Sequence, residues 1–591
     1  MAKHTLDIMQ IVGEGDELAH NITNQYQRWK NQRREWEDQR QEIRRYIVAT
    51  DTTKTTNANL PWKNTTTLPK LAQIRDNLHA NYMAALFPHD DWFKWQAMKR
   101  DEEFTRKAKI IEAYMKNKLQ TSDFRQEVSK LVYDYIDYGN AFAEVVYDSE
   151  YHTDDEGTVF PVRVGPRVVR ISPMDIVFDI SAPSFKDAPK ITRTITTLGR
   201  LQKRINTETV ENGWLQDAFD KAIEVRGRVG RAEASDVIKR DGFSVDGFSN
   251  VQDYYTSGYV EMLEFEGDIY DVYNDTLLEN HRIIVIDRMW VAYQAPYKSW
   301  LGRSNKEHVG WRLRSDTLMA MGPLDNLVGM QYRVDHLENL KADVFDQIAH
   351  PVIYQRGNVE AWEWGPGERI YGDEESDVRV LAPDATALNA DFQIQNLQNQ
   401  MEEMAGAPRQ AMGIRTPGEK TAFEVQALEN AAGRIFQNKV SHFEDVFLEP
   451  LLNQMLEVAR RNLDVTDQVR IQDDDLGVVE FTDIKQEDIQ ASGVLVPIGA
   501  RHFARKNQLA QNLVQLTSSP AYQDPAVNAH ISGKSIAKAV EELLDMERFD
   551  LVRENVRVAE TTETAGLAQQ GEDTLAVESQ VGPEQFIGPQ Q

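Results

Sequence analysis

The sequence contains no cysteine, which excludes a disulfide framework, a thiol nucleophile and a cysteine-ligated zinc site. It also has no apolar run approaching the ~20 residues that a membrane-spanning helix requires. The N-terminal stretch MAKHTLDIMQIVGEGDE lacks the apolar core of a signal peptide. We therefore expect a soluble protein that is made in a cytoplasm and inserts into no membrane.

Basic residues are scarce relative to acidic ones. The chain has 66 lysines and arginines against 94 aspartates and glutamates, and its net charge is −28 at pH 7. Proteins that hold DNA or an anionic membrane over their whole surface are usually basic, so this composition disfavours that class of protein. The length of 591 residues predicts about four domains.

Catalytic motifs are missing as well: there is no GxSxG, no HExxH and no spaced His/Asp cluster. Two stretches approach a phosphate-binding P-loop. In the first, Glu419 intrudes between Gly418 and Lys420; in the second, Asn528 stands where the first glycine belongs. Neither follows a predicted strand, which the motif needs to aim its backbone amides at phosphate. We therefore predict no catalytic residues, no metal and no cofactor.

Two short acidic stretches that contain histidine suggest metal sites, but turns explain them better. Residues 89–91 (HDD) follow a helix-ending proline, and three adjacent ligands cannot converge on one ion without distant partners. Residues 152–157 (HTDDEG) lack the spaced oxygen ligands of an EF-hand, so we predict a hairpin tip there.

Residues 16–48 are predicted to form one helix whose apolar side carries Tyr26, Trp29, Trp36, Ile43 and Ile47. A helix that faces nucleic acid is one interpretation, because aromatics alternate with Arg28, Arg33, Arg34, Arg40, Arg44 and Arg45. Four acidic residues between positions 35 and 42 dilute that charge. We therefore favour a solvated amphipathic helix that docks by its tryptophans.

The rest of residues 1–314 alternates between helices and strands, which predicts an α+β fold. Residues 227–258 are rich in Gly and Asp and are predicted to form a loop. The predicted helices cover 70–87, 101–120, 123–138 and 198–226. The predicted strands cover 142–146, 162–171, 260–265, 269–273 and 282–291.

Residues 315–405 predict two helices around a small β module. Pro323 opens a helix to about residue 349, whose apolar face is opposed by Asp325, Asp335, Glu338, Asp343 and Asp346. We expect His336 and Asp335 to form a surface pair and not a catalytic dyad. Two strands, two intervening tryptophans and a second, polar helix follow: 352–355, 377–381, Trp362, Trp364 and 388–404.

Residues 406–463 predict a loop that becomes one very long helix. Glycines and prolines keep 406–418 from being helical throughout. The helix start is marked by an N-cap, an N1 proline and a capping-box glutamate, which are Thr416, Pro417 and Glu419. An apolar face follows at helical spacing, and Pro450 predicts a kink because it cannot donate a hydrogen bond to the carbonyl of Val446.

The C-terminal part mixes strands and helices before a polar tail. We predict short strands at 478–481 and 493–496 and helices at 501–516 and 535–546. Residues 561–591 are dominated by Gln, Glu, Gly and Thr and contain no Lys or Arg, so this tail is predicted to be disordered.

Several segments resemble tailed-bacteriophage portal proteins of the podovirus type. Residues 138–142 (YGNAF) resemble the turn into the first strand of the family's wing, and 172–179 (SPMDIVFD) resemble its P-x-D-hydrophobic-hydrophobic-D segment. Thr421, Ala422 and Glu424 resemble the motif after its tunnel loop. The order helix, β module, helix, loop and long helix is also that of stem, clip, stem, tunnel loop and wing helix.

The resemblance implies an α+β portal-like subunit with an α/β wing, a two-helix stem, a small β clip, a long kinked helix and a mainly helical crown. Its regions would be an N-terminal wing at 1–314, stem helices at 315–350 and 387–405, the clip at 351–386, the tunnel loop at 406–418, the long helix at 419–463, C-terminal wing strands and crown helices at 464–560, and the tail at 561–591.

The resemblance further implies a dodecameric homo-oligomer at one capsid vertex, through which double-stranded DNA is packaged and ejected. The implied partners are DNA bound without sequence preference, the terminase large subunit, tail adaptor proteins and the major capsid or scaffolding protein. The implied location is the virion, after assembly in the host cytoplasm. Another ring-forming capsid or tail adaptor protein is the main alternative, and a packaging ATPase fits less well.

Two groups of side chains are candidate contact sites under this resemblance. The tunnel loop is locally basic, with Arg409, Arg415 and Lys420 against Glu419, and is expected to touch DNA phosphates without reading sequence. The alternative is that its arginines pair with acids of a neighbouring subunit and lock the ring. For the clip, we expect Trp362 and Trp364 to contact its partners.

Overall fold

A computed structural model describes sixteen segments of the chain, and the statements below concern these residues. They are 16–48, 64–88, 92–97, 102–153, 159–207, 214–228, 258–271, 275–297, 299–300, 302–363, 369–381, 390–405, 435–463, 467–472, 479–490 and 493–498. The chain divides into two compact units, 1–500 and 501–591, and all described residues lie in the first. The predicted helices after residue 500 and the predicted disordered tail are therefore outside the described residues.

The N-terminal part contains five helices. They are α1 (Asp16–Gln32), α2 (Arg34–Val48), α3 (Lys70–Leu86), α4 (Glu102–Thr121) and α5 (Phe124–Asp137). The single helix predicted for 16–48 is broken at Arg33, whereas α3, α4 and α5 match their predicted spans closely. Pro69 stands at the N-cap of α3, as its fixed φ angle favours.

A five-stranded antiparallel sheet forms one layer of the fold, in the order β4-β5-β6-β7-β8. Its strands are β4 (Ile176–Phe178), β5 (Lys190–Thr197), β6 (Tyr259–Asp271), β7 (Thr276–Ile286) and β8 (Trp290–Pro296). The predicted strands at 260–265 and 269–273 are one strand with a bulge, and β5 was not predicted.

Helices cover both faces of this sheet. Alternate residues of the central strands point to opposite faces, so Leu263 and Phe265 pack with α1. Val260 and Met262 pack on the other side with α6 (Leu198–Thr207) and α7 (Gln216–Arg228). Sequence reasoning expected a single helix over 198–226, but Trp214 makes a β-bridge to Tyr293 between the two helices.

The largest core lies between α3, α4, α5, a second sheet and the C-terminal half of the long helix. This sheet has the order β3-β2-β9, formed by β2 (Asn140–Thr153), β3 (Val159–Ile171) and β9 (Lys306–Gly310). Two strand pairs complete the unit, β1 (Phe93–Ala97) with β14 (Gly493–Pro497) and β12 (Asp467–Gln472) with β13 (Val479–Ile484), and α14 (Gln486–Ile489) follows. The prediction included β13 and β14 but missed β1 and β12. Overall, the α+β class is confirmed.

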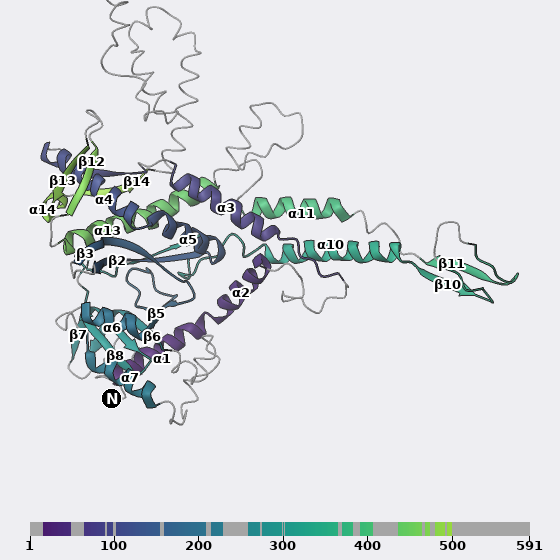
Figure 1. Cartoon of the computed structure of the whole chain (residues 1–591), viewed down its shortest axis with the longest axis horizontal. Coiled ribbons are helices and arrows are strands. Elements are labelled where there is room, and N and C mark those ends of the chain that lie inside the picture. Colours follow the sequence, from purple (N-terminus) through teal and green to yellow (C-terminus); the bar gives the residue numbers. More distant parts are fainter. Residues whose placement is uncertain are drawn as a thin grey trace, which may run out of the picture. The chain divides into compact units, whose positions relative to one another are not determined.

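The helix, hairpin and helix predicted within 315–405 are present in that order, and we keep the names stem for the two helices and clip for the hairpin. Helix α10 (Val328–Ala349) leads to the hairpin of β10 (Val352–Arg356) and β11 (Asp377–Leu381), and α11 (Asp391–Met404) returns beside α10, as Figure 1 shows. Helix α10 begins five residues after Pro323, because 323–327 form turns that bury Leu324 and Leu327.

The long helix is described from residue 435. A π-helical turn at Glu444–Leu448 leads into α13 (Glu449–Asn462), and the apolar face is buried as predicted at Phe443, Phe447, Leu451, Met455 and Val458. The widened turn ends two residues before Pro450, whose missing N–H interrupts regular helical hydrogen bonding. Ile435, predicted on the same face, is exposed.

One backbone contact sets where the stem begins. Gly139, between α5 and β2, has φ +70°, and a Cβ at this position would lie 2.3 Å from the backbone nitrogen of Gly322. The next residue reinforces the contact, since the Asn140 side chain accepts from the Ala320 N–H and donates to the Ala320 carbonyl. Glycine is therefore required at position 139 for both its φ angle and its lack of a side chain.

We predict that Gly139→Ala lowers the melting temperature of the protein. An L-residue in the left-handed region costs ~1–2 kcal/mol, and the added Cβ also forces the 320–322 backbone away. Gly329→Ala in α10 is the control, because that position has no neighbouring atom within 4 Å. Alanine there is favoured by up to ~1 kcal/mol. Equal thermal unfolding curves for the two variants would contradict this role of Gly139.

Candidate functional site: the stem, its root and the clip

The root of the stem is an ion-paired junction of three helices. Arg40 of α2 makes a two-pronged pair with Asp325, whose carboxylate also accepts the Gly322 N–H at 3.0 Å. Arg75 of α3 forms a similar pair with Asp137 at the end of α5, with N–O distances of 2.6 and 2.8 Å. Two-pronged guanidinium–carboxylate pairs fix orientation as well as distance, so α2, α3 and α5 all converge on the start of α10.

A polar ladder on α10 binds an extended segment of the chain, residues 64–68. Its four side chains recur every fourth residue: Gln331, Asp335, Asn339 and Asp343. Three of them bond every second residue of the segment. Asp335 accepts from the Leu68 N–H, and Asp343 accepts from the Asn64 N–H. Between them, Asn339 accepts from the Thr66 N–H and donates to the Thr66 carbonyl. Gln331 adds bonds to Leu68 C=O and Leu71 N–H.

The spacing of helix and strand explains why this ladder works. Four helical residues rise about 6 Å, while two extended residues span about 6.6 Å, so the repeats nearly match. The side-chain amides and carboxylates of α10 therefore take the place of a neighbouring β-strand. The segment connects to α3 through Pro69, so the ladder ties the stem to the helical core.

Asp335 is the buried centre of the ladder. Its Oδ1 accepts from Leu68 N–H at 3.0 Å and from Gln331 Nε2 at 2.9 Å, while Oδ2 has no hydrogen-bond partner among the described residues. Burial raises the pKa of Asp335 to about 7, although these two hydrogen bonds oppose the rise. The expectation of a surface pair with His336 is therefore wrong, because residues 64–68 cover Asp335.

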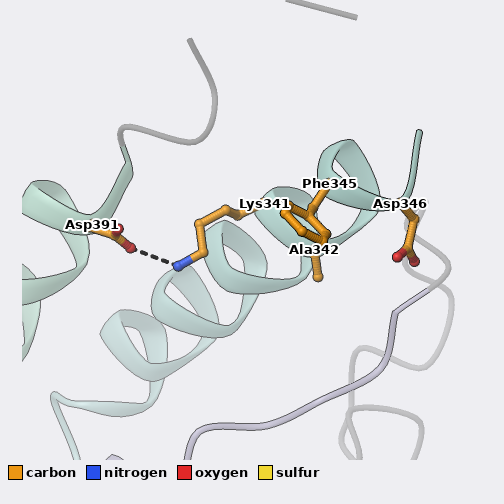
Figure 2. A pocket seen from close by; sticks show the side chains of 5 residues that line it. All are labelled: Lys341, Ala342, Phe345, Asp346 and Asp391. Carbon is orange, nitrogen blue, oxygen red and sulfur yellow. Dashed lines mark hydrogen bonds and ion pairs between the residues drawn. The ribbon is translucent and has the colours of Figure 1, made fainter. Parts of the chain in front are cut away.

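The two stem helices are held together in one antiparallel register. Lys341 of α10 donates to Asp391 at the start of α11 at 2.7 Å, as Figure 2 shows. Closer to the root, Glu402 of α11 forms a buried ion pair with Lys70. The next residue, Leu71, donates its backbone N–H to the side chain of Gln331 on α10. A pocket of about 340 Å³ opens beside Lys341 and is lined by Lys341, Ala342, Phe345, Asp346 and Asp391.

The clip hairpin exposes most of its side chains. β10 pairs with β11 from Val352↔Leu381 to Arg356↔Asp377, and apolar side chains are exposed on both strands: Val352, Tyr354, Val380 and Leu381. A two-stranded hairpin is at best marginally stable alone in water. Trp362 is half-buried nearby in sequence, and Trp364 lies outside the described residues.

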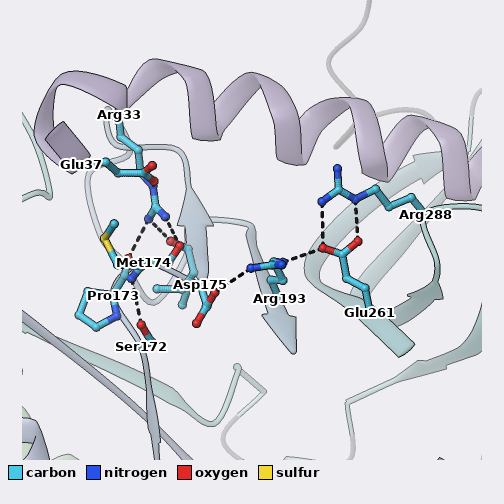
Figure 3. A network of polar contacts seen from close by, with 10 residues as sticks. Arg33, Glu37, Ser172, Pro173, Met174, Asp175, Arg193, Glu261 and Arg288 are labelled. Carbon is cyan, nitrogen blue, oxygen red and sulfur yellow. Dashed lines mark hydrogen bonds and ion pairs between the residues drawn. The ribbon is translucent and has the colours of Figure 1, made fainter. Parts of the chain in front are cut away.

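A second polar network fixes the N-terminal helices to the five-stranded sheet (Figure 3). Arg33, at the break between α1 and α2, donates to the carbonyls of Pro173 at 3.0 Å, Met174 at 2.6 Å and Ile176. Its Nε also donates to Glu37 at 2.8 Å. The helix break thus positions one buried guanidinium to bind the whole 173–176 turn, which belongs to the SPMDIVFD segment.

The network continues into the sheet through Asp175. Arg193 of β5 approaches Asp175 at 3.4 Å and donates to Glu261 at 2.6 Å. Arg288 also donates to the Glu261 carboxylate, at 2.7 and 2.8 Å. Burial opposes ionisation of Glu261, but the hydrogen bonds and charges of Arg288 and Arg193 outweigh it and hold its pKa below the usual value. This carboxylate is therefore ionised and structural.

The environment of Arg33 and Arg40 bears on whether residues 16–48 face nucleic acid. Arg33 and Arg40 are buried and bonded within the protein, and both guanidinium groups lie over the Trp36 ring, at 5.7 and 5.4 Å. Tyr26 and Trp29 belong to the core beneath the sheet. For these side chains the structure agrees with the favoured interpretation, a solvated helix docked by its tryptophans, and the other four arginines are exposed: Arg28, Arg34, Arg44 and Arg45.

Among the described residues, one group of carboxylates is compact enough to suggest a metal site. Oxygens of Glu144, Glu264 and Glu266 lie within 4.8 Å of one another. Lys306 already donates to Glu264 at 2.8 Å and to Glu266 at 2.9 Å, and Arg282 donates to Glu264 at 2.9 Å. Two side-chain cations therefore offset much of the negative charge of the three carboxylates, and we interpret the group as structural.

Most of the predicted site residues lie outside the described part of the chain. These are the DNA-facing candidates Arg409, Arg415 and Lys420, the helix-start residues Thr416, Pro417 and Glu419, and Trp364. Pro450 and Trp362 are the predicted site residues that lie in the described part of the chain. Sequence reasoning missed the ladder because Gln331 and Asn339 were not considered, although the four-residue spacing was visible.

Comparison with known proteins supports one family. A family profile described as bacteriophage head to tail connecting protein matches residues 19–173, about a quarter of the chain. No curated protein matches the sequence. The matched span runs from α1 through β3 into the turn that Arg33 binds, and it confirms the recognised resemblance to phage portal or connector proteins. Among the described helices, none has the length and apolar character to cross a membrane.

We predict that the free energy of unfolding declines as pH rises from about 4 to about 7 because of Asp335. Its folded pKa of about 7 exceeds the unfolded value, so its contribution is greatest below about pH 4 and is lost as pH rises through 7. Asp335→Asn keeps the Oδ1 acceptor without the charge and should flatten the decline of melting temperature between pH 5 and pH 8. Asp335→Leu should be less stable at every pH, and an unchanged slope in the Asn variant would disprove the assignment.

We also predict that Arg33→Lys destabilises the protein by roughly 1–3 kcal/mol, because one ammonium group cannot replace the planar set of donors to three carbonyls and Glu37. The adjacent, exposed Arg34 provides the control as Arg34→Lys. Thermal unfolding should shift only for the Arg33 variant. Equal shifts would mean that the network does not depend on guanidinium geometry.

Proposed function

We propose that this chain, whose N-terminal part matches the bacteriophage head to tail connecting protein family, is the subunit of a portal ring at one capsid vertex. Double-stranded DNA is packaged and ejected through the ring. The observation that carries the proposal is the combination of this match with a two-helix stem ending in an exposed hairpin. The family is a structural one, and the proposed role is likewise not enzymatic.

The charge of the stem suits a channel through which DNA slides. Acidic residues outnumber basic ones in α10 and α11, in a chain of net charge −28. A wall of the same sign as the phosphate backbone disfavours tight binding, so the duplex moves without adhering. The basic loop at 406–420 would be the one place in this region where phosphates are contacted.

The exposed clip is the proposed docking site for other components of the particle. Its uncovered apolar side chains suit contact with the terminase large subunit during packaging and with tail adaptors afterwards. The wing would face the major capsid or scaffolding protein. The virion is the proposed location of the assembled ring, with assembly in the host cytoplasm.

Another ring-forming head-to-tail adaptor is the second candidate, because the family description covers connecting proteins generally. The stem, hairpin, stem order favours the portal. Negative-stain imaging and native mass spectrometry of the purified full chain would test the ring, for which we expect twelve subunits. A protein that stays monomeric at micromolar concentration, with and without scaffolding protein, would argue against both candidates.

We predict that Arg409→Ala combined with Arg415→Ala leaves ring formation normal but loses or shortens packaged genomes. Each substitution removes a phosphate contact without touching the stem, so assembly and packaging separate. Arg34→Ala with Arg45→Ala, an exposed pair on α2, is the control and should package normally. If rings themselves fail to form in the loop variant, the arginines bind a neighbouring subunit and the DNA assignment is wrong.

A further inference from the structure

The stem leaves two complementary faces uncovered. On α10, Arg333, His336 and Leu340 share one face, because they are three and four residues apart. On α11, Phe392, Asn396, Asn399 and Glu403 share another. Leu340 is 41% exposed and Phe392 is 77% exposed, high values for large apolar side chains on packed helices. We call these sets the α10 face and the α11 face.

The two faces point to opposite sides of the stem. Lys341 and Asp391 face each other across the helix pair. Leu340 comes one residue before Lys341, and Phe392 comes one residue after Asp391. Each step turns a right-handed helix by about 100°. Because the helices are antiparallel, these two steps rotate the side chains to opposite sides of the plane that contains both helix axes.

The register of the helices places matching chemistry at equal depth. The Lys341–Asp391 contact fixes the two residues that lie at the same height along the stem. Because the helices are antiparallel, counting down from 341 on α10 and up from 391 on α11 gives further residues at equal height. Leu340 is therefore level with Phe392, His336 with Asn396, and Arg333 with Asn399. Glu403 lies one turn beyond Asn399, within reach of the long Arg333 side chain. An apolar residue is thus level with an apolar one, and a cation lies near an anion.

We propose that the α10 face of one copy of this chain packs against the α11 face of the next copy. The inference rests on the proposed ring and specifies its contact. In a closed ring, neighbouring subunits are related by rotation alone, so residues at equal depth along the axis meet. Leu340 then contacts Phe392 of the neighbouring copy, and Arg333 pairs with Glu403 of that copy.

The pocket beside Lys341 supports this pairing. It is open on the stem surface, and Asp391 on its wall directly precedes Phe392 in the sequence (Figure 2). Its volume of about 340 Å³ is ample for a leucine side chain. Leu340 of the adjoining copy would lie at the root end of this pocket, beside Asp391. The amides of α11 can be buried in such a contact at less cost than charges.

The absence of cysteine allows a direct test. Leu340→Cys and Phe392→Cys each introduce a single thiol at an exposed position, where folding should be unaffected. The two full-length proteins are mixed, assembled and treated with a mild oxidant. We expect a two-chain product on a denaturing gel from the mixture and none from either variant alone. Gln393→Cys is the control partner for Leu340→Cys, since it is exposed but turned away from the α11 face.

The outcomes separate this contact from the ring itself. Rings by native mass spectrometry without the 340–392 product would overturn the contact and leave the ring. A product from Leu340→Cys alone would show a two-fold contact and also overturn it. Monomers only would overturn both. A charge exchange gives a second measurement: Arg333→Glu and Glu403→Arg should each lower the ring fraction severalfold, and the double variant should recover it. Failure of that recovery would contradict the ion pair.

Discussion

The close approach of two backbone segments at Gly139 and Gly322 is the constraint on which the arrangement of this unit depends. No side chain fits between them, so the end of α5 and the start of the stem can be brought into direct contact. Asp325 then accepts the Gly322 N–H and binds Arg40, which brings α2 to the same point. The direction in which the stem leaves the fold is therefore set by a glycine contact and one buried ion pair.

Buried basic side chains account for how an acidic chain holds its helices in place. Arg33, Arg40, Arg193 and Arg288 are each bonded to several oxygens inside the protein. A guanidinium in such a site loses its hydration and must recover it through carboxylates and carbonyls placed at fixed angles. These arginines thereby couple α1 and α2 to the sheet on one side and to the stem on the other. These buried guanidinium groups are not available to DNA.

Sequence patterns predicted the elements whose periodicity is strong and local. The stem helices, both clip strands and the buried face of α13 follow from spacing and from Gly and Pro positions. β1 was missed because it is five residues long and is stabilised by pairing with β14, about 400 residues away. β5 carried a visible signal, since Lys190–Thr197 is rich in β-branched residues. The acidic face assigned to α10 was wrong at Asp335, because a distant extended segment covers it.

The ladder on α10 and the clip hairpin differ in how far the described residues satisfy or cover their side chains. On α10, side chains spaced four apart bond the backbone of the extended segment 64–68, so these polar groups are satisfied within one chain. The hairpin at the stem tip has no such partner among the described residues, and neither do the exposed apolar side chains of the α10 and α11 faces. The described residues leave these apolar side chains exposed. In the proposed ring, the tip of the stem would therefore be covered by neighbouring copies, whereas the polar groups of the ladder are already bonded within one chain.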